Sequence, residues 1–591
     1  MHITGGEGMY SKIVAVNDAW VKPGMDHQVL DVDSRYYGGV TDDENGIAWP
    51  NHSVGTPAAM AVWAAALVNP DSAYYRNEGV LIRLELAAQY MLRVQHEDGS
   101  ISPGWTNFHS PPDTAFVVVG YAQVYQLLIG DDWLELRRVT DAIRLFLERT
   151  IPVMLTGGCH TPNHRWVLCA ALGFLHELFD LPEALARAGM WLAEGLDETP
   201  DGEWTERSNG IYNAVSDIML IHAARLLKLP ELLEPVRRNL HMMVYLVHPD
   251  GEVVTEYSGR QDFGVMMNLS SYLLPYAMLA TKDEDAIFEA MAVAAIQVTD
   301  HPGGAPINAA VRFLLEPRLQ TRKISPAALP VTYNKLLNGG FPRADYLSRM
   351  DEAGHHQHIY HSRLHTDFGA PVARYRQKDT SATLMTEASS FLSLRHGNAR
   401  LLAVQAASYF SPGFVPMQEL TAHETGWTLS GQQAKGYYGP VAAADLPPTS
   451  QEEISPWYLL PHHKRPLTHE QKHEIRVDVD RQEDVWTLRF RSEGPVDCMT
   501  QILFVFGREG KFTCGEYRLV NEAVQCWTGG MARYESGNAW FELTGTAMEH
   551  TATSVRGAAY PVDCHTLLVN WMAPFDQTIT IRMSPLPVSE V

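Results

Sequence analysis

Two patterns of hydrophobic positions divide the chain. Between residues 40 and 320, apolar residues recur at i, i+3, i+4 and i+7, the spacing of an amphipathic helix. The segments that carry this pattern most clearly are 57–67, 80–96, 132–150, 164–179, 181–196, 214–227 and 231–248. From about residue 364 the chain changes to short runs rich in β-branched and aromatic residues, joined by Gly, Asn and Asp turns. The pattern therefore predicts a multidomain α + β protein.

Turn signals recur at a regular interval in the helical part. They fall at Asn45-Gly46, Asp98-Gly99, Gly157-Gly158, Asp201-Gly202, Asp250-Gly251 and Gly303-Gly304. The interval is roughly fifty residues, the length of two helices with their connections. This repeat predicts an N-terminal (α/α) toroid of about six helical hairpins at residues 1–345, with an open helical solenoid as the alternative. The strand pattern predicts a C-terminal antiparallel β-sandwich at residues 346–591.

The charge of the chain limits its partners. Lys and Arg number 46 against 69 Asp and Glu, which gives a formal net charge of −23. Such a surface repels phosphate backbones and anionic membranes, so neither nucleic acid nor a membrane is an expected partner. An acidic oligo- or polysaccharide would need a local cluster of Arg. The charge is compatible with a homo-oligomer.

The N-terminus and the cysteines favour a cytoplasmic location. Residues 1–20 lack the continuous apolar run of a secretory signal, and the six cysteines have no CxxC spacing. The alternative is a secreted protein whose signal has been removed. The most apolar segment, 115–128, is broken by polar residues and predicts a core helix.

Reactive side chains follow successive turns in the same register of the repeat. They are Arg35, Tyr36, Trp49 and His52 around the first turn; Trp105, Asn107, His109 and Asp113 after the second; His160, Asn163, His164, Arg165 and Trp166 after the third; Glu206, Arg207, Asn209 and Tyr212 after the fourth; and Glu256, Tyr257, Arg260, Gln261 and Asp262 after the fifth. In a toroid, equivalent points of successive hairpins open on one mouth. Aromatic rings, Asn, Arg and carboxylates together are typical of a sugar-binding site.

The domain order and two short motifs carry a family resemblance. The motifs are Thr161-Pro162-Asn163-His164-Arg165-Trp166 at a helix entry, and Asp250-Gly251 followed by Tyr257-Ser258-Gly259-Arg260. With them the chain resembles the toroid-plus-sandwich polysaccharide lyases, including the heparinase II/III-like and the chondroitin/hyaluronate lyase-like groups. Toroid-containing uronic-acid hydrolases share the N-terminal architecture and compete for the same observations.

The resemblance implies β-elimination beside a uronic acid. Asn163 would neutralise the uronate carboxylate, His164 or His109 would be the base, and Tyr257, near Arg260, the acid or base. A nearby Arg would lower the pKa of such a tyrosine. Tyr212 joins this catalytic set, and Arg260 would bind the carboxylate. The substrate-binding set is Arg35, Trp105, Asp113, His160, Arg165, Glu206 and Gln261.

Other interpretations of these residues stay open. Asn163 is also well placed to be the N-cap of the helix that follows, and Arg165 and Trp166 to be helix-surface and core positions. A glycoside hydrolase, such as a glucuronidase, would instead need an acid/base or acid/nucleophile pair of carboxylates. Its candidates are Asp113, Glu206, Glu256 and Asp262. A non-catalytic carbohydrate-binding protein is the third hypothesis.

A histidine-rich segment lies near the predicted domain boundary. His358, His361, His365 and Asp367 have i,i+3 and i,i+4 spacings compatible with zinc, and heparinase-II-like enzymes carry a His/Asp zinc site. The alternative is a solvated loop, or a histidine that reaches the toroid mouth. The sequence has no P-loop, GxGxxG, GxSxG or HExxH motif, and the predicted chemistry requires no cofactor.

Overall fold

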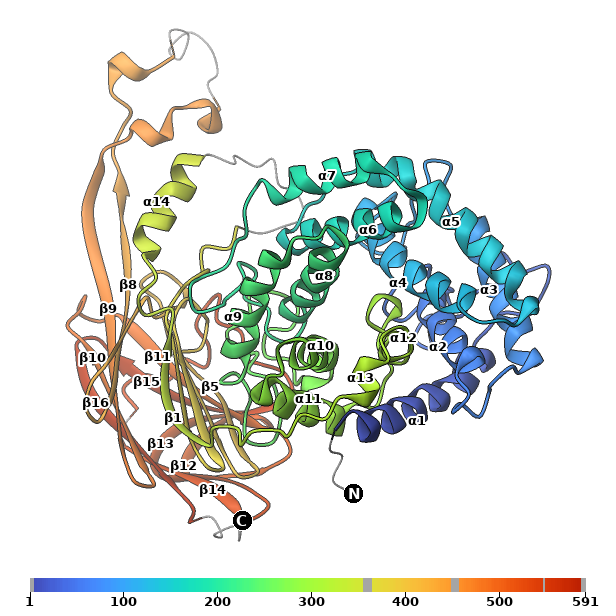
Figure 1. The fold of residues 1–591 in the computed structure, drawn as a ribbon. Helices are drawn as coiled ribbons and strands as arrows, with labels where there is room; N and C mark the ends of the chain where they lie inside the picture. Colours follow the sequence, from blue (N-terminus) through green and yellow to red (C-terminus); the bar gives the residue numbers. More distant parts are fainter. Residues whose placement is uncertain (1–4, 354–363, 448–455, 546–547, 586–591) are drawn as a thin grey trace. The chain divides into compact units, whose positions relative to one another are not determined.

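The chain forms two compact units. The computed structural model describes residues 5–353, 364–447, 456–545 and 548–585 (Figure 1). Unit 1 comprises Met1–Pro330 and Gly340–Gly369, and unit 2 comprises Val331–Gly339 and Ala370–Val591. The two units therefore alternate around residues 331–369, where the sequence prediction placed one boundary after residue 345.

Six helices of unit 1 are buried along most of their length. They are α2 (Thr56–Val68), α4 (Pro111–Ile129), α6 (Pro162–Phe179), α8 (Tyr212–Leu226), α10 (Leu273–Asp283) and α12 (Ala309–Leu315). Each contacts the next in this order, and α12 also contacts α2, so the succession closes. The predicted core helix at 115–128 corresponds to α4, which is apolar on nearly every side.

The remaining long helices pack against these six. They are α1 (Gly5–Asp26), α3 (Glu78–Val94), α5 (Arg137–Thr156), α7 (Pro182–Leu192), α9 (Leu233–Met243) and α11 (Ala286–Val298). Each contacts a buried helix that is its neighbour in sequence (Figure 1). Shorter helices are η1 (Leu134–Leu136), η2 (Pro230–Leu232), η3 (Leu269–Tyr272), η4 (Ala305–Ile307), α13 (Arg318–Thr321) and α14 (Arg343–Ala353). Among the described residues, no helix combines the length and apolar character that a membrane span requires.

The predicted turns have the backbone that glycine permits. Gly99 and Gly202 have φ of +84° and +104°, and a Cβ on either would lie within 2.5 Å of the backbone of another segment. A side chain at these positions would be strained and would clash. The turns hold the loops that precede the buried helices α4 and α8.

Unit 2 is a single hydrogen-bonded sheet. Its strands are β1 (Thr332–Leu337), β2 (Val372–Gln377), β3 (Thr380–Met385), β4 (Leu392–His396), β5 (Ala399–Ser408), β6 (Gly413–Phe414), β7 (Glu419–Ala422), β8 (Gly426–Tyr438), β9 (Leu467–Gln482), β10 (Val485–Ser492), β11 (Met499–Gly507), β12 (Lys511–Asn521), β13 (Val524–Ser536), β14 (Ala539–Thr544), β15 (Cys564–Met572) and β16 (Phe575–Met583). Three short helices, η5 (Ala443–Asp445), η6 (Trp457–Leu459) and η7 (His462–Lys464), lie between β8 and β9.

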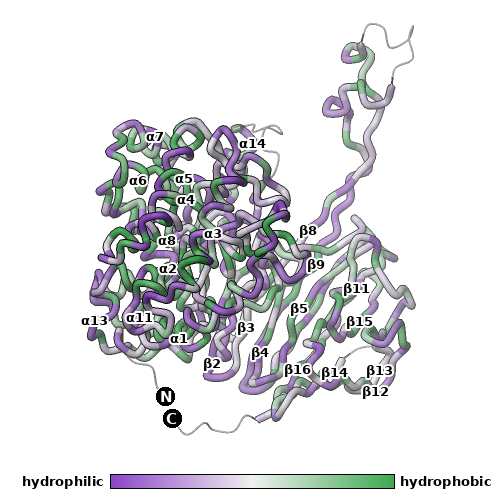
Figure 2. The backbone as a smooth tube through the Cα atoms, turned by 90° about the vertical axis from the view of Figure 1, so that its right-hand side faces the viewer, coloured by the Kyte–Doolittle hydropathy of each residue, from purple (hydrophilic) through white to green (hydrophobic). Residues whose placement is uncertain are grey.

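The order of the strands differs from the predicted sandwich. It runs β1-β2-β3-β4-β5-β11-β15-β13-β14-β16-β10-β9-β8-β7, with β12 on β13 and β6 on β5. Pairing is antiparallel except between β13 and β15, so the sheet is mixed. The sheet curls: β2 and β10 are far apart in the order of the strands, yet the ring of Tyr375 on β2 lies 5.7 Å from that of Trp486 on β10. Buried positions alternate with more exposed ones along β10. Figure 2 shows hydrophilic and hydrophobic residues interspersed along the strands of unit 2. The described strands belong to one curled sheet, and a sandwich of two separate layers is not shown. Alternation along a strand predicts which of its sides is buried, but it does not predict which strands pair.

Candidate active site

The N-terminus of α6 holds a buried carboxylate. Pro162 and Asn163 are the first two residues of this helix, and Glu206 lies on the loop before α8. The backbone N–H of Asn163 donates to Glu206 Oε2 at 2.9 Å, and the Asn163 Nδ2 donates to the same oxygen at 2.6 Å. A carboxylate is favoured there by the unpaired N–H groups and the helix dipole. The N-cap interpretation of Asn163 is wrong, because Thr161 occupies that position.

Arg260 joins this carboxylate to an aromatic ring. Its Nη1 forms an ion pair with Glu206 Oε1, and its guanidinium lies 4.4 Å from the centre of the Tyr212 ring. Gln261 hydrogen-bonds the side chain of Tyr212. Burial, followed by the charge of Asp262, raises the pKa of Tyr212, so its hydroxyl keeps its proton. This is the reverse of the lowered pKa expected for a tyrosine beside Arg260.

His164 is held as a neutral imidazole. Burial lowers its pKa to about 3, and the charges of His160, Arg260 and His52 act in the same direction. The rings of His160 and His164 meet edge to face at 4.9 Å. Among the described residues, nothing hydrogen-bonds its Nδ1. A neutral imidazole can accept a proton.

His52 and Asp113 extend the group. His52 stacks on Phe116 at 4.1 Å, and burial lowers its pKa to about 4 against the opposing charge of Asp113. Asp113 accepts hydrogen bonds from Ser110 and Asn107 at 2.6 and 2.9 Å. The sequence prediction gave His52 no role, although its position in the repeat was the available signal.

Several predicted site residues have their partners elsewhere. The His109 ring stacks on His96 at 3.7 Å and pairs with Asp98 at 3.1 Å. Arg165 holds Glu194 and Asp197 at 3.2 and 2.5 Å, and its side chain is only 13% exposed, so it is not a solvated helix-surface position.

Two further predicted binding residues contact aromatic rings. The guanidinium of Arg35 lies 5.2 Å from the Tyr36 ring. Trp105 meets Trp49 edge to face at 5.3 Å and is 42% exposed. Trp166 is buried, as its core interpretation expects. These contacts join none of the three to the Asn163 group.

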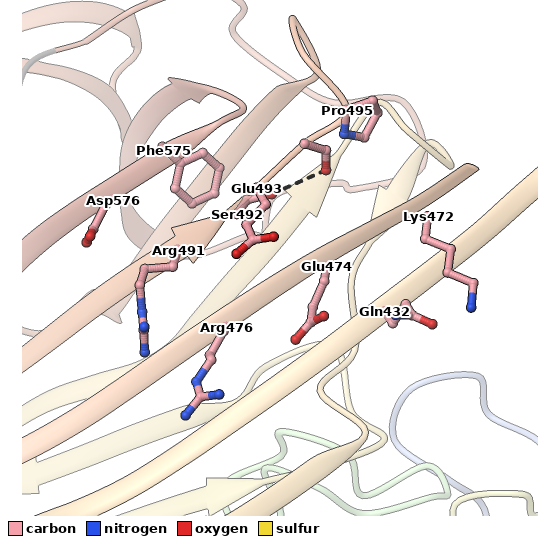
Figure 3. Close-up of a pocket in the computed structure, with 11 residues that line it drawn as sticks. Gln432, Lys472, Glu474, Arg476, Arg491, Ser492, Glu493, Pro495, Phe575 and Asp576 are labelled. Carbon is pink, nitrogen blue, oxygen red and sulfur yellow. Dashed lines mark hydrogen bonds between the residues drawn. The ribbon is translucent and has the colours of Figure 1, made fainter.

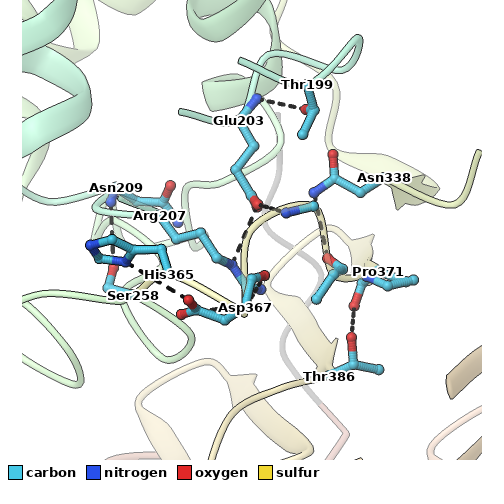
Figure 4. Close-up of polar contacts among 12 residues, drawn as sticks. Thr199, Glu203, Arg207, Asn209, Ser258, Asn338, His365, Asp367, Pro371 and Thr386 are labelled. Carbon is cyan, nitrogen blue, oxygen red and sulfur yellow. Dashed lines mark hydrogen bonds and ion pairs between the residues drawn. The ribbon is translucent and has the colours of Figure 1, made fainter. Parts of the chain in front are cut away.

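A second polar network, which the sequence analysis did not predict, lies around Arg207 (Figure 4). The ring of Tyr257 lies 4.7 Å from the fully buried guanidinium of Arg207. Arg207 donates to the backbone oxygen of Asp367 at 2.8 Å, and the Gly369 N–H donates to Glu203 at 2.8 Å. The network therefore binds residues 365–369 to the loop before α8.

The same network bears on the zinc prediction. Of the predicted ligands, His358 and His361 lie outside the described residues. His365 Nδ1 lies 3.8 Å from Asp367 Oδ1, and Arg207 Nη1 lies 3.9 Å from the other Asp367 oxygen. A guanidinium so close disfavours a dication. Within the described residues no three His, Cys, Asp or Glu side chains form a metal-ligand group, and zinc binding stays a prediction for elemental analysis.

The carboxylates of the hydrolase hypothesis are all held by donors. Glu206 is bound as described above, and Glu256 pairs with His248 at 2.8 Å. Asp262 accepts from the Ser208 hydroxyl and the Gly210 N–H at 2.8 and 2.9 Å.

A groove of about 640 Å³ lies on the sheet of unit 2, on β8, β9, β10 and β16 (Figure 3). Its arginines, Arg476 and Arg491, both form ion pairs with Asp478, and Glu474 and Glu493 are part of its lining. The groove therefore lacks the concentrated positive charge that an acidic substrate requires.

The fold is similar to that of known polysaccharide lyases. Over 99% of this chain and 86% of the other, it matches heparinase III with a TM-score of 0.52 at 11% identity. It matches the chondroitin AC lyase of Streptomyces coelicolor A3, solved with chondroitin sulphate, over 98% and 80% with a TM-score of 0.52 at 13% identity. A xanthan lyase of Paenibacillus matches over 98% and 57% with a TM-score of 0.52 at 10% identity. No family profile and no curated protein matches the sequence. The chain therefore has the fold of these polysaccharide lyases.

Proposed function

We propose that the chain is a polysaccharide lyase that cleaves beside a uronic acid by β-elimination. The observation that carries the proposal is the group in which Asn163 and Arg260 share Glu206 while Arg260 covers Tyr212. The lyase fold supports it. We further propose that the closed succession of helices is an (α/α) toroid of about six hairpins, and that the curled sheet corresponds to the β-sandwich of such enzymes.

Arg260 is the proposed partner of the uronate carboxylate. A guanidinium has five N–H donors in a fixed fork, more than one carboxylate uses, so Arg260 can hold Glu206 and a substrate carboxylate together. The Asn163 amide donates to Glu206, so its Oδ1 is turned away from that carboxylate. The proposed role of Asn163 is to donate to Glu206 together with Arg260 while charge develops on the substrate. These fixed groups would stabilise the enolate in a way that water cannot.

The two proton transfers are assigned to His164 and Tyr212. In β-elimination the C5–H bond breaks, a C4–C5 double bond forms, and the C4–O bond breaks. Neutral His164 would accept the C5 proton, and a substrate carboxylate on Arg260 would offset part of the charge that lowers the pKa of His164. Protonated Tyr212 would donate to the departing oxygen. All steps use side chains, so the proposal requires no cofactor.

The test is a screen of uronate-containing polysaccharides with purified protein. A lyase generates an unsaturated uronate, and the ultraviolet absorbance of the solution rises with turnover. Rising reducing ends without new absorbance would contradict the lyase and favour a uronic-acid hydrolase. In that case the carboxylates Asp113, Glu206, Glu256 and Asp262 are the residues to substitute.

A further inference from the structure

A second cavity lies close to the candidate site, in unit 1. It has a volume of about 300 Å³ and is formed by α1, the loop around residues 40–43, the start of α2 and the loop at 301–303. The lining residue Gly303 is two positions before Ala305, whose N–H donates to the His52 carbonyl at 2.8 Å. Its size is at the lower end for small-molecule sites, so it fits one ring better than an oligosaccharide.

An aromatic platform forms one wall of this cavity. The indole Nε1 of Trp20 donates to the Asp300 carbonyl at 2.9 Å, and the His301 ring meets the indole edge to face at 4.4 Å. Both contacts fix the orientation of Trp20, which is 40% exposed. The floor includes Gly55 and Ala59, and their small size leaves room for a ligand. A fixed, partly exposed indole offers an apolar face at little cost in conformational entropy.

Polar groups lie around Trp20 in the same cavity. The His301 Nδ1 accepts the Gly303 N–H at 3.0 Å, which puts the proton of the neutral ring on Nε2 as a donor. Burial lowers the pKa of His301, so the ring is neutral. Asp42 and Asp43 supply acceptors, and Asp43 also pairs with His27 at 2.8 Å. An indole face with a few donors and acceptors matches the apolar and hydroxyl sides of a sugar ring.

The described lining of the cavity has no counterpart of the Arg260 guanidinium. Among the described residues that line it there is no Lys or Arg, and two carboxylates are present. A uronate or sulfated sugar would meet repulsion and find no cationic partner. We infer that this cavity binds one uncharged sugar ring against Trp20, at a subsite separate from the Asn163 group. The inference deepens the proposed function and rests on it for the class of ligand.

Binding without turnover tests the inference. The probes are methyl glucoside, methyl galactoside and methyl N-acetylglucosaminide, with glucuronate as the charged counterpart, followed by saturation-transfer NMR and tryptophan fluorescence. At least one neutral probe should bind, and glucuronate should bind at this cavity at least tenfold more weakly. Trp20→Ala should weaken neutral binding at least tenfold, and Ala59→Leu should do the same by filling the cavity. Trp457→Ala, at an exposed tryptophan of unit 2, should leave it unchanged.

The possible outcomes separate this inference from the proposed function. The inference is wrong if no neutral probe binds, if both cavity variants bind like the wild type, or if glucuronate binds this cavity equally well. If the protein is an active lyase and gives that result, only the proposed subsite is refuted. If a neutral probe binds through Trp20 but the protein has no lyase activity, only the proposed function is refuted.

Discussion

Replacing Asn163 by Ala is the most informative perturbation of the candidate site. The substitution removes the 2.6 Å hydrogen bond to Glu206, while the backbone N–H of residue 163 and Arg260 still hold that carboxylate. A hydrogen bond to a charged group contributes about 1.5–3 kcal/mol. Glu206 keeps two partners, so we expect the free energy of unfolding to fall by about 2 kcal/mol, with the fold intact.

The effect on the rate should be larger than the effect on stability. Asn163 acts on the substrate through Glu206 and Arg260, so the about 10²–10³ fall in kcat typical of one lost direct oxyanion donor, or about 2.7–4 kcal/mol in the barrier, is the upper bound that we expect. The assay is turnover of a uronate polysaccharide at 25 °C, with the melting temperature of each variant. Asn17→Ala is the matched control, since Asn17 is also buried and its amide donates to the Val62 carbonyl at 3.0 Å.

The control decides how a loss of activity is interpreted. Asn17→Ala should lose stability on a similar scale and keep its rate. Full activity of Asn163→Ala would refute the assigned role of this amide. Equal loss of rate in both variants would mean that activity reports stability alone.

Three further predictions concern the neighbours of Asn163. Arg260→Lys should raise KM for uronate substrates by about tenfold or more and spare uncharged ligands, because Lys lacks the bidentate fork; unchanged KM in steady-state kinetics would remove Arg260 from substrate binding. Tyr212→Phe should lower kcat by about 10²–10⁴, the range for a lost general acid, and Tyr257→Phe by less than tenfold, so the reverse order would make Tyr257 the proton donor. The pKa of His164 is about 3 in the folded state and about 6.5 in the unfolded state. Between these values the unfolded state binds more protons, so the free energy of unfolding should fall as the pH drops below about 6.5. The expected loss from this group is about 1.4 kcal/mol per pH unit. Urea unfolding at pH 5 and 7 should show a smaller loss in His164→Gln, and an identical loss would contradict the buried neutral imidazole.

Sequence periodicity predicted much of unit 1. The predicted segments 57–67, 164–179 and 214–227 correspond closely to α2, α6 and α8, because their apolar positions fit the helical repeat. Asn163, Glu206 and Arg260 follow successive turns at equivalent positions of the repeat, which predicted that they lie together. In the structure, both Asn163 and Arg260 contact the carboxylate of Glu206. A repeat predicts which loops share an end of the domain, and that sufficed for these three residues, whereas His109 and Arg165 of the same predicted group have partners elsewhere.

The sequence did not predict which side chains of these loops contact one another. Arg260 covers Tyr212, and Arg207 covers Tyr257, although Tyr257 and Arg260 are three residues apart in sequence. Such choices depend on the geometry of loops that meet only in the folded chain. The same holds in unit 2, where the parallel contact of β13 with β15 joins strands that local alternation describes identically.

The mass of the product tests the central claim most directly. A purified uronate-containing tetrasaccharide is digested to completion, and all products are identified by mass spectrometry. β-Elimination adds no water, so the product masses should sum to that of the substrate, with one fragment carrying a double bond and new ultraviolet absorbance. Products that sum to the substrate plus one water for each bond cut, all saturated, would contradict the lyase assignment.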